Sequence, residues 1–310
     1  MKKGSPARIA LEDRAAGAMG TLARALPRRA TLALGRSLGR LLAATDRRHV
    51  AIAMDNLRRA FPSWDDTAIR RTAHGVYAHF GAVLLDLLWL EGKTRAELEG
   101  LVEFEGAEHL RHAEAAGRGL LFPTAHFGNW EIGGIAHAAF LRPMHVIARP
   151  LDNPRLDRRL SALRTQTGNT VIYKRQALPS ILRVLRSNGV VALLIDQNVV
   201  AAEGVFVEFF GRPACTTPVV AALHLKTRCA VVPSRAVLLP DGRYRVICGP
   251  PLEWQPTGNR RDDLIGITQE LTRRVEAWVR DTPDQWLWMH RRWKTQPRAE
   301  DGTAGEVAVP

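Results

Sequence analysis

The sequence predicts an α/β fold with a mainly parallel central sheet flanked by helices and with a helical N-terminal extension. Short apolar runs typical of buried strands alternate along the chain with longer segments of helical periodicity. The chain of 310 residues is 46% hydrophobic, so it can bury a substantial core in one large domain. Because alternating strands and helices favour crossover connections, we expect most strands to be parallel.

Each element follows from its local pattern. The stretch 76–90 is long, apolar and free of proline, which predicts a buried helix in which His79 and Asp86 are satisfied core polar groups. Further strands are expected near 119–123, 144–149, 170–173, 190–195, 229–238 and 243–248. Further helices are expected near 131–141, 154–167, 177–187, 218–226 and 262–281.

Residues 29–47 have the pattern of a basic amphipathic helix. Four arginines fall in one sector (Arg29, Arg36, Arg40 and Arg47), and four leucines gather opposite them (Leu34, Leu38, Leu41 and Leu42). The leucines either pack on the domain or contact a membrane surface. Glycines and arginines in this helix disfavour insertion, and we expect no window with the length and apolar character of a spanning helix.

These patterns divide the chain into three parts. Residues 1–48 form a polar tail followed by the amphipathic helix, 49–295 the main domain, and 296–310 a tail. Residues 1–20 and 295–310 are polar or small and are expected to be disordered. The three cysteines form no metal-ligand pair and cannot all pair with one another, and no signal-peptide pattern is present, which together favour a reducing cytosolic setting.

The segment His126-Phe-Gly-Asn-Trp-Glu131 lies where a buried strand turns into a helix. A histidine there can act as a general base while a carboxylate on its other nitrogen orients it, which predicts Glu131 as the partner of His126. Because neither serine nor cysteine lies beside the pair, the substrate's own hydroxyl is the expected nucleophile. The alternative is a histidine hydrogen-bonded to a carboxylate for purely structural reasons. The spacing does not favour a metal site.

Other polar residues fall near the same edge of the predicted sheet. Asn129 suits the N-cap of the following helix, whose free amides face a developing oxyanion. Arg149 and Asp196 each end an apolar strand and can reach the pocket, or can serve a salt bridge and a turn respectively. Phe206, Phe209 and Phe210 either line a channel or pack in the core. The aromatic and basic cluster around Trp286 suits a headgroup interface or a C-terminal cap.

Together, five stretches resemble the lipid A biosynthesis acyltransferases, within the lysophospholipid acyltransferase superfamily. They occur in the family's order over about residues 45 to 295: Asn56–Pro62, the His-x4-Glu motif of His126 and Glu131, Arg149–Pro154 with Arg158 and Arg164, Asp196–Asn198 with the segments 204–211 and 214–218, and Pro283–Lys294. The resemblance implies a glycerolipid-acyltransferase-like fold, with His126 and Glu131 catalytic and Asn129, Arg149, Arg164 and Asp196 binding substrate.

The resemblance also implies an O-acyltransferase that needs no cofactor and moves a fatty acyl chain to a hydroxyl of a lipid A precursor. The donor is acyl carrier protein or acyl-CoA. The net charge of +13 suits an acidic carrier and an anionic membrane, which places the protein peripherally on the cytoplasmic face of a bacterial inner membrane. Alternatives are another glycolipid or lysophospholipid acceptor, or an inactive lipid-binding module. Nucleic-acid binding lacks a recognition signature.

Overall fold

The computed structural model describes residues 5–174 and 177–297. Its central sheet has five parallel strands in the order β4-β3-β5-β2-β8. Their bounds are β2 Leu120–Thr124, β3 His145–Ala148, β4 Thr170–Tyr173, β5 Val190–Leu194 and β8 Ala230–Val231. The crossover helices are α7 Trp130–Phe140, α8 Pro154–Thr165, α9 Ala177–Arg186 and α10 Val219–Thr227. The predicted α/β architecture is therefore confirmed.

Two smaller sheets complete the β structure. β1 (Val102–Glu105) pairs in parallel with β10 (Tyr244–Cys248), which pairs antiparallel with β9 (Ser234–Leu238). β6 (Val205–Phe209) and β7 (Arg212–Thr216) form a hairpin. The single strand expected over 229–238 is wrong, because Pro233 follows β8 and the chain leaves the central sheet before β9 begins.

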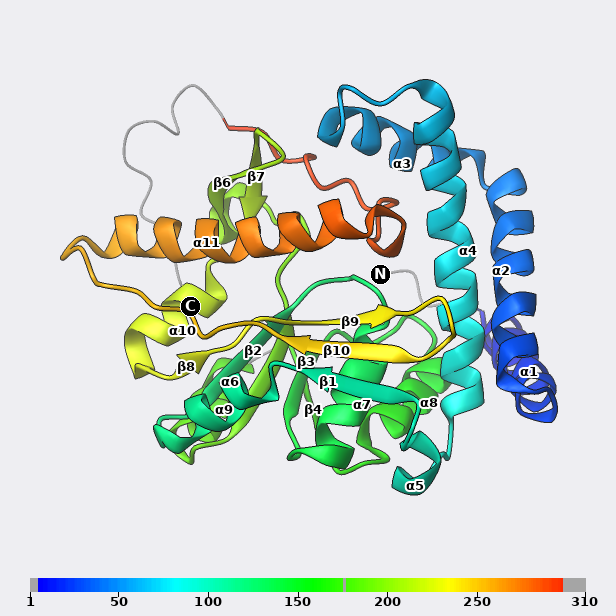
Figure 1. Cartoon of the computed structure of the whole chain (residues 1–310), viewed down its shortest axis with the longest axis horizontal. Coiled ribbons are helices and arrows are strands. Elements are labelled where there is room, and N and C mark those ends of the chain that lie inside the picture. Colours follow the sequence, from blue (N-terminus) through cyan, green and yellow to red (C-terminus); the bar gives the residue numbers. More distant parts are fainter. Residues whose placement is uncertain (1–4, 175–176, 298–310) are drawn as a thin grey trace.

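Three further helices lie beside the smaller sheet. α5 (Arg95–Leu98) and α6 (Ala107–Ala115) flank β1, and α11 (Arg260–Asp281) runs across the molecule above β9 and β10 (Figure 1). Two short 3-10 turns, η1 (Ala201–Glu203) and η2 (Pro283–Gln285), follow β5 and α11. All three cysteines, Cys215, Cys229 and Cys248, are buried.

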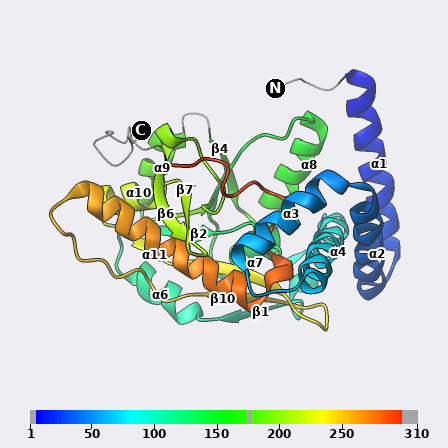
Figure 2. The same cartoon turned by 90° about the horizontal axis from the view of Figure 1, so that it is seen from above.

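The N-terminal third is helical from residue 6. α1 (Pro6–Ala25), α2 (Arg28–Thr45), α3 (Arg47–Ala60) and α4 (Asp66–Leu90) lie together at one end of the molecule (Figures 1 and 2). The disorder expected for residues 1–20 is wrong over α1, where Ser5 caps a regular helix. Residues 298–310 of the expected C-terminal tail lie outside the described residues.

α2 packs on α4 through backbone contact. A Cβ added at Gly35 would lie 2.6 Å from the Gly81 carbonyl oxygen, and one at Gly39 would clash with the Tyr77 carbonyl oxygen. Glycine is therefore required where the two helices touch. This buries the glycine face of α2 and leaves Leu38, Leu41 and Leu42 exposed by 42%, 65% and 56%. Of the two interpretations of the leucines, packing on the domain is wrong for these three.

α4 corrects another expectation. Among the described residues it is the one helix with the length and apolar composition of a membrane span. More than half of its apolar window is buried, and it packs against α1, α2 and α3. As predicted, its polar residues are satisfied: Arg28 donates two hydrogen bonds of 2.9 Å to Asp86, and the His79 ring lies 3.1 Å from the Gly128 carbonyl oxygen.

Candidate active site

His126 lies on the turn between β2 and α7, at the carboxyl edge of the central sheet. Gly128 in this turn has φ +58°, and a Cβ there would clash with the Ala236 carbonyl oxygen of β9. Glycine therefore allows the turn to contact β9, and the Asn129 amide donates to the same oxygen at 3.0 Å. Leu287 N–H donates to the His126 carbonyl oxygen at 3.1 Å, so the C-terminal segment also holds the turn.

Asp196 is the residue that contacts the His126 ring. Its Oδ1 lies 2.8 Å from His126 Nδ1, and its Oδ2 accepts the His126 backbone amide at 2.9 Å. The parallel register of β2 and β5 pairs Thr124 with Leu194, so His126 and Asp196 each stand two positions beyond paired strand ends. Trp286 Nε1 donates to Oδ2 at 2.8 Å, and the carboxylate is buried.

The charges of this pair reinforce each other. Burial by itself lowers the pKa of His126, but attraction and hydrogen bonding to Asp196, with a further contribution from Glu131, raise it above its ordinary value. Burial likewise opposes ionisation of Asp196, and His126 outweighs it and lowers the pKa of that carboxyl. Because an ionised carboxylate only accepts, Nδ1 of a neutral His126 carries the proton and Nε2 carries the lone pair. The Gln197 amide nitrogen lies 3.3 Å from Nε2.

Glu131 lies in the first turn of α7 and is paired with Arg164 of α8. Arg164 Nε and one terminal nitrogen lie 2.8 and 2.5 Å from the two carboxylate oxygens, and Trp130 Nε1 donates to Oε1 at 3.0 Å. Both partners are largely buried. We expected Glu131 on the second nitrogen of His126; the contact at Nδ1 is made by Asp196, which stands closer because strand register brings it there.

Trp130 lies between the two charged pairs. Its ring is 5.1 Å from the His126 ring at an interplanar angle of 67°. The same ring lies 6.1 Å from the Phe80 ring of α4. The indole thus touches the imidazole through its ring and Glu131 through its N–H. Sequence reasoning did not single out Trp130, because an aromatic residue beside a turn is common.

Asn129 caps α7 as its position predicts. Its Oδ1 accepts the Ile132 amide at 3.1 Å, and its Nδ2 donates to the Tyr244 hydroxyl at 3.0 Å. Tyr244 in turn donates to Asp86 at 2.6 Å. The Asn129 side chain is fully buried in this chain of contacts, which ties the start of α7 to α4 and β10.

The other predicted residues lie farther from these contacts. Arg149 is exposed just after β3, at the same carboxyl edge of the sheet. Phe209 and Phe210 are buried in the main core, which favours the core interpretation over a channel. Trp286, Trp288 and Trp293 are buried too, and Arg292 donates to the Cys215 carbonyl oxygen at 2.9 Å. The tryptophans of this segment therefore pack in the core at the C-terminal end of the fold, and the interpretation that they contact lipid headgroups is wrong.

A cavity of about 50 Å³ opens beside the Glu131–Arg164 pair. Its walls come from α7, β2, β3, β5 and β9 and are mainly apolar, with Trp130, Glu131, Arg164, Met144, Val146 and Ala192 among the lining residues. A volume of this size has room for roughly a few water molecules. No group of three or more histidine, cysteine or acidic side chains converges as metal ligands in residues 5–174 and 177–297.

Comparison with known proteins matches the chain to a family over most of its length. The model of the bacterial lipid A biosynthesis acyltransferases covers residues 8–295. The chain is 28% identical to the lipid A biosynthesis lauroyltransferase of Escherichia coli K12, over 85% of each chain. It is 24% identical to a lipid A biosynthesis acyltransferase of Haemophilus influenzae, over 80% of this chain and 77% of the relative.

A third relative differs in the acceptor that its name states. The phosphatidylinositol mannoside acyltransferase of Mycolicibacterium smegmatis is 26% identical over 60% of each chain. The lipid A family model nevertheless extends from α1 to the segment after η2, and it includes both charged pairs of the site. The chain therefore belongs to the bacterial lipid A biosynthesis acyltransferase family, and it is an O-acyltransferase.

Proposed function

We propose that this protein transfers a fatty acyl chain from the thioester of acyl carrier protein to a hydroxyl of a lipid A precursor, with His126 as general base. Family membership supports acyl transfer to a lipid A precursor. The observation that supports His126 is its contact with Asp196 at Nδ1, which directs the basic Nε2 away from the carboxylate. The base and the residue that orients it have the arrangement that activates a hydroxyl in acyl transfer.

The proposed reaction is a direct displacement. The acceptor hydroxyl attacks the thioester carbonyl as Nε2 takes its proton, and the tetrahedral intermediate collapses with loss of the thiolate, which recovers that proton from the imidazolium. Asp196 stabilises the imidazolium. No acyl-enzyme forms, because the nucleophile is the acceptor itself.

We assign Glu131 and Arg164 a shared role. Glu131 adds negative charge near His126 and so favours its protonated form during the transfer. Arg164 compensates that carboxylate, and it supplies positive charge at the wall where a thioester oxyanion would develop. Arg149, exposed at the same edge of the sheet, would meet a phosphate of the acceptor.

Membrane attachment is proposed through the exposed leucines of α2, on the cytoplasmic face of a bacterial inner membrane. The triple variant with Leu38, Leu41 and Leu42 changed to serine should lose most of its flotation with anionic liposomes, because the apolar contact is removed. Val200→Ser is the control, because Val200 is an equally exposed apolar residue (58%) outside α2. Its neighbour Val199 accepts a hydrogen bond from Thr295, so this site belongs to a different part of the chain. Equal flotation of the triple variant and the control would place the membrane contact elsewhere.

Donor choice follows from charge. The net charge of +13 favours docking of an acidic carrier protein, and this attraction is screened by salt. Assays with the same acyl chain on carrier protein and on coenzyme A should give a higher kcat/KM for the carrier thioester. An equal or higher value for the coenzyme A ester at physiological salt would remove the argument for carrier docking.

Similarity to the phosphatidylinositol mannoside acyltransferase supports a second acceptor class, another glycolipid. Mass spectrometry of total lipids from cells with and without the gene distinguishes the two. The proposed function expects one acyl chain fewer on lipid A when the gene is removed, restored by the wild-type protein and not by His126→Ala. An unchanged lipid A together with a lost acyl chain on another glycolipid would replace the proposed acceptor.

A further inference from the structure

α8 holds Arg164 in place although it has little core packing of its own. Of its twelve residues, all of which the structure describes, Leu163 alone is buried. Apolar burial is the main force that fixes a helix on a domain, and α8 buries little apolar surface. Its position must therefore depend strongly on the polar contacts along its edges.

Those polar contacts lie mostly on the side of α8 that faces α1 and the end of α4. At the N-terminal end, Asn153 caps α8 and donates from Nδ2 to the Ile9 carbonyl oxygen at 3.1 Å and to Glu12 at 2.9 Å. At the C-terminal end, Gln166 donates to the Leu90 carbonyl oxygen at 3.2 Å and accepts the Gly92 amide at 3.0 Å. Both ends of α8 are thus attached to the N-terminal helices.

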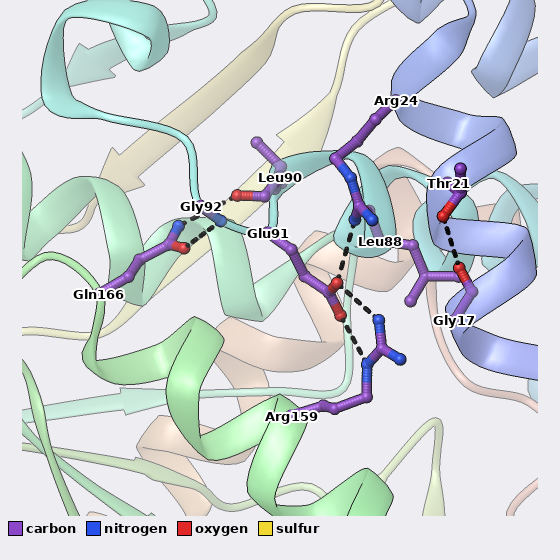
Figure 3. Close-up of polar contacts among 9 residues, drawn as sticks. All are labelled: Gly17, Thr21, Arg24, Leu88, Leu90, Glu91, Gly92, Arg159 and Gln166. Atoms are coloured by element: carbon purple, nitrogen blue, oxygen red, sulfur yellow. Dashed lines mark hydrogen bonds and ion pairs between the residues drawn. The ribbon is translucent and has the colours of Figure 1, made fainter. Parts of the chain in front are cut away.

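Glu91 stands between these two attachments and binds two arginines at once. Arg159 of α8 donates to its two carboxylate oxygens at 3.2 and 2.8 Å. Arg24 of α1 donates to Oε2 at 3.1 Å and also to the Leu88 carbonyl oxygen at 3.0 Å. Figure 3 shows the two guanidinium groups reaching the carboxylate from opposite sides, one from α1 and one from α8.

We propose that Glu91 is a positioning residue for acyl transfer: it joins α1 to α8 through Arg24 and Arg159 and so holds Arg164 of α8 against Glu131. This inference rests on the proposed function, in which the Glu131–Arg164 pair supports the reaction. Arg164 follows Arg159 by five positions, so α8 is fixed by Glu91 on one side and meets α7 on the other. The N-terminal helix α1 becomes part of the support of the active site.

Charge explains why Glu91 matters more than a surface ion pair. Its side chain is 21% exposed, and it is shared by Arg24 and Arg159; Asp13 adds only a smaller attraction to Arg159. Loss of the carboxylate replaces two attractions with one repulsion between α1 and α8. Because α8 has few apolar contacts, that repulsion should displace it and with it Arg164.

The test compares Glu91→Gln with Glu103→Gln. Glu103 is the matched control, because its carboxylate is also shared by two arginines, Arg243 and Arg245, at the edge formed by β1 and β10. We expect Glu91→Gln to lower kcat about tenfold with KM changed less than about threefold, since a misplaced charge mainly affects the transition state. Glu91→Asp should recover part of the loss, and Glu103→Gln should retain wild-type kcat.

Two further measurements separate positioning from general destabilisation. Hydrogen exchange of the α8 amides should become faster in Glu91→Gln and not in Glu103→Gln. In an Arg164→Gln background, Glu91→Gln should change kcat less than about twofold, because the residue through which it acts is already gone. Equal kcat values for Glu91→Gln and Glu103→Gln, or full additivity with Arg164→Gln, would overturn the inference.

The proposed function fails on different evidence. If Arg164→Gln itself has wild-type kcat, the assigned role of the Glu131–Arg164 pair is wrong. If Arg164→Gln is impaired while Glu91→Gln behaves like Glu103→Gln, that role stands and only the positioning by Glu91 is rejected. The same assay therefore gives each hypothesis its own contradicting result.

Discussion

The two carboxylates of the candidate site, Asp196 and Glu131, are both buried but are held in opposite ways. Asp196 follows a core strand and is fixed by an imidazole, a backbone amide and an indole N–H. Glu131 lies in the first turn of α7 and accepts hydrogen bonds from its neighbour Trp130 and from Arg164, which belongs to the thinly packed α8. One carboxylate is anchored by the core, whereas the other depends on how two helices are arranged.

This difference teaches where the site can tolerate change. The half containing His126 and Asp196 is built from two adjacent parallel strands, and its geometry persists as long as the central sheet does. The geometry of the half containing Glu131 and Arg164 depends on the position of α8, which surface contacts of α8 can change. We therefore expect variants in the first half to lower kcat strongly, and variants in the second half to lower it by smaller factors.

Replacing His126 by alanine should have the largest effect. If Nε2 takes the acceptor proton, His126→Ala should lower kcat at least about a hundredfold, the usual size of a general-base contribution. Steady-state acyl transfer measures it, with circular dichroism and substrate binding as controls for folding. Wild-type turnover of purified His126→Ala, under conditions where chemistry limits the rate, would contradict the assignment.

Asp196→Asn should come next, with a fall of about a hundredfold and a change in pH dependence. Asp196 outweighs burial and raises the pKa of His126, so without its charge that pKa falls. The base is active when neutral, and the acid limb of kcat/KM should move to lower pH while the plateau drops because the tautomer is no longer fixed. A limb that stays in place would show that another group titrates there.

Glu131→Gln should reduce kcat by about tenfold to a hundredfold, and it should also destabilise the fold. Removing one partner of a largely buried ion pair leaves the Arg164 charge uncompensated, whereas removing both partners does not. The double variant Glu131→Gln with Arg164→Gln should therefore unfold at a higher urea concentration than either single variant. A double variant less stable than both would mean that the pair itself provides net stability.

The smallest expected effect concerns the support of the site turn at acidic pH. Burial lowers the pKa of His79, which contacts the Gly128 carbonyl oxygen, to about 4. Its unfolded pKa is near 6.5, so between these values the unfolded chain binds the extra proton and stability falls as pH falls. We expect a loss of about 1.6 kcal/mol between pH 6.5 and 5 from this residue.

Urea unfolding at pH 7 and pH 5 measures that loss. His79→Gln should show a smaller difference between the two pH values than the wild type, and His112→Gln, at an exposed position on α6, serves as the control. An identical pH difference in wild type and His79→Gln would assign the acid sensitivity to other groups.

Local patterns were sufficient for much of this protein. The strand before His126, the helix after it, its cap at Asn129 and the alternation that favours a parallel sheet all follow from residues within a few positions of one another. Each of the five motifs that resemble the family is also a short local stretch, although their order spans about residues 45 to 295. Elements whose signals were weaker, such as α1 and the break at Pro233 between β8 and β9, were missed or merged.

The partners of the site residues were decided by tertiary structure. His126 and Glu131 stand five positions apart in the sequence, which favoured pairing them, but Asp196 reaches Nδ1 from 70 positions away because β2 and β5 are adjacent and in register. Trp286 joins them from the far end of the chain, and Arg164 meets Glu131 through the docking of α8 on α7. The sequence by itself determined which chemical groups stand at the ends of the strands. Their pairing depended on strand order and helix docking, because non-local contacts leave no periodic signal in the chain.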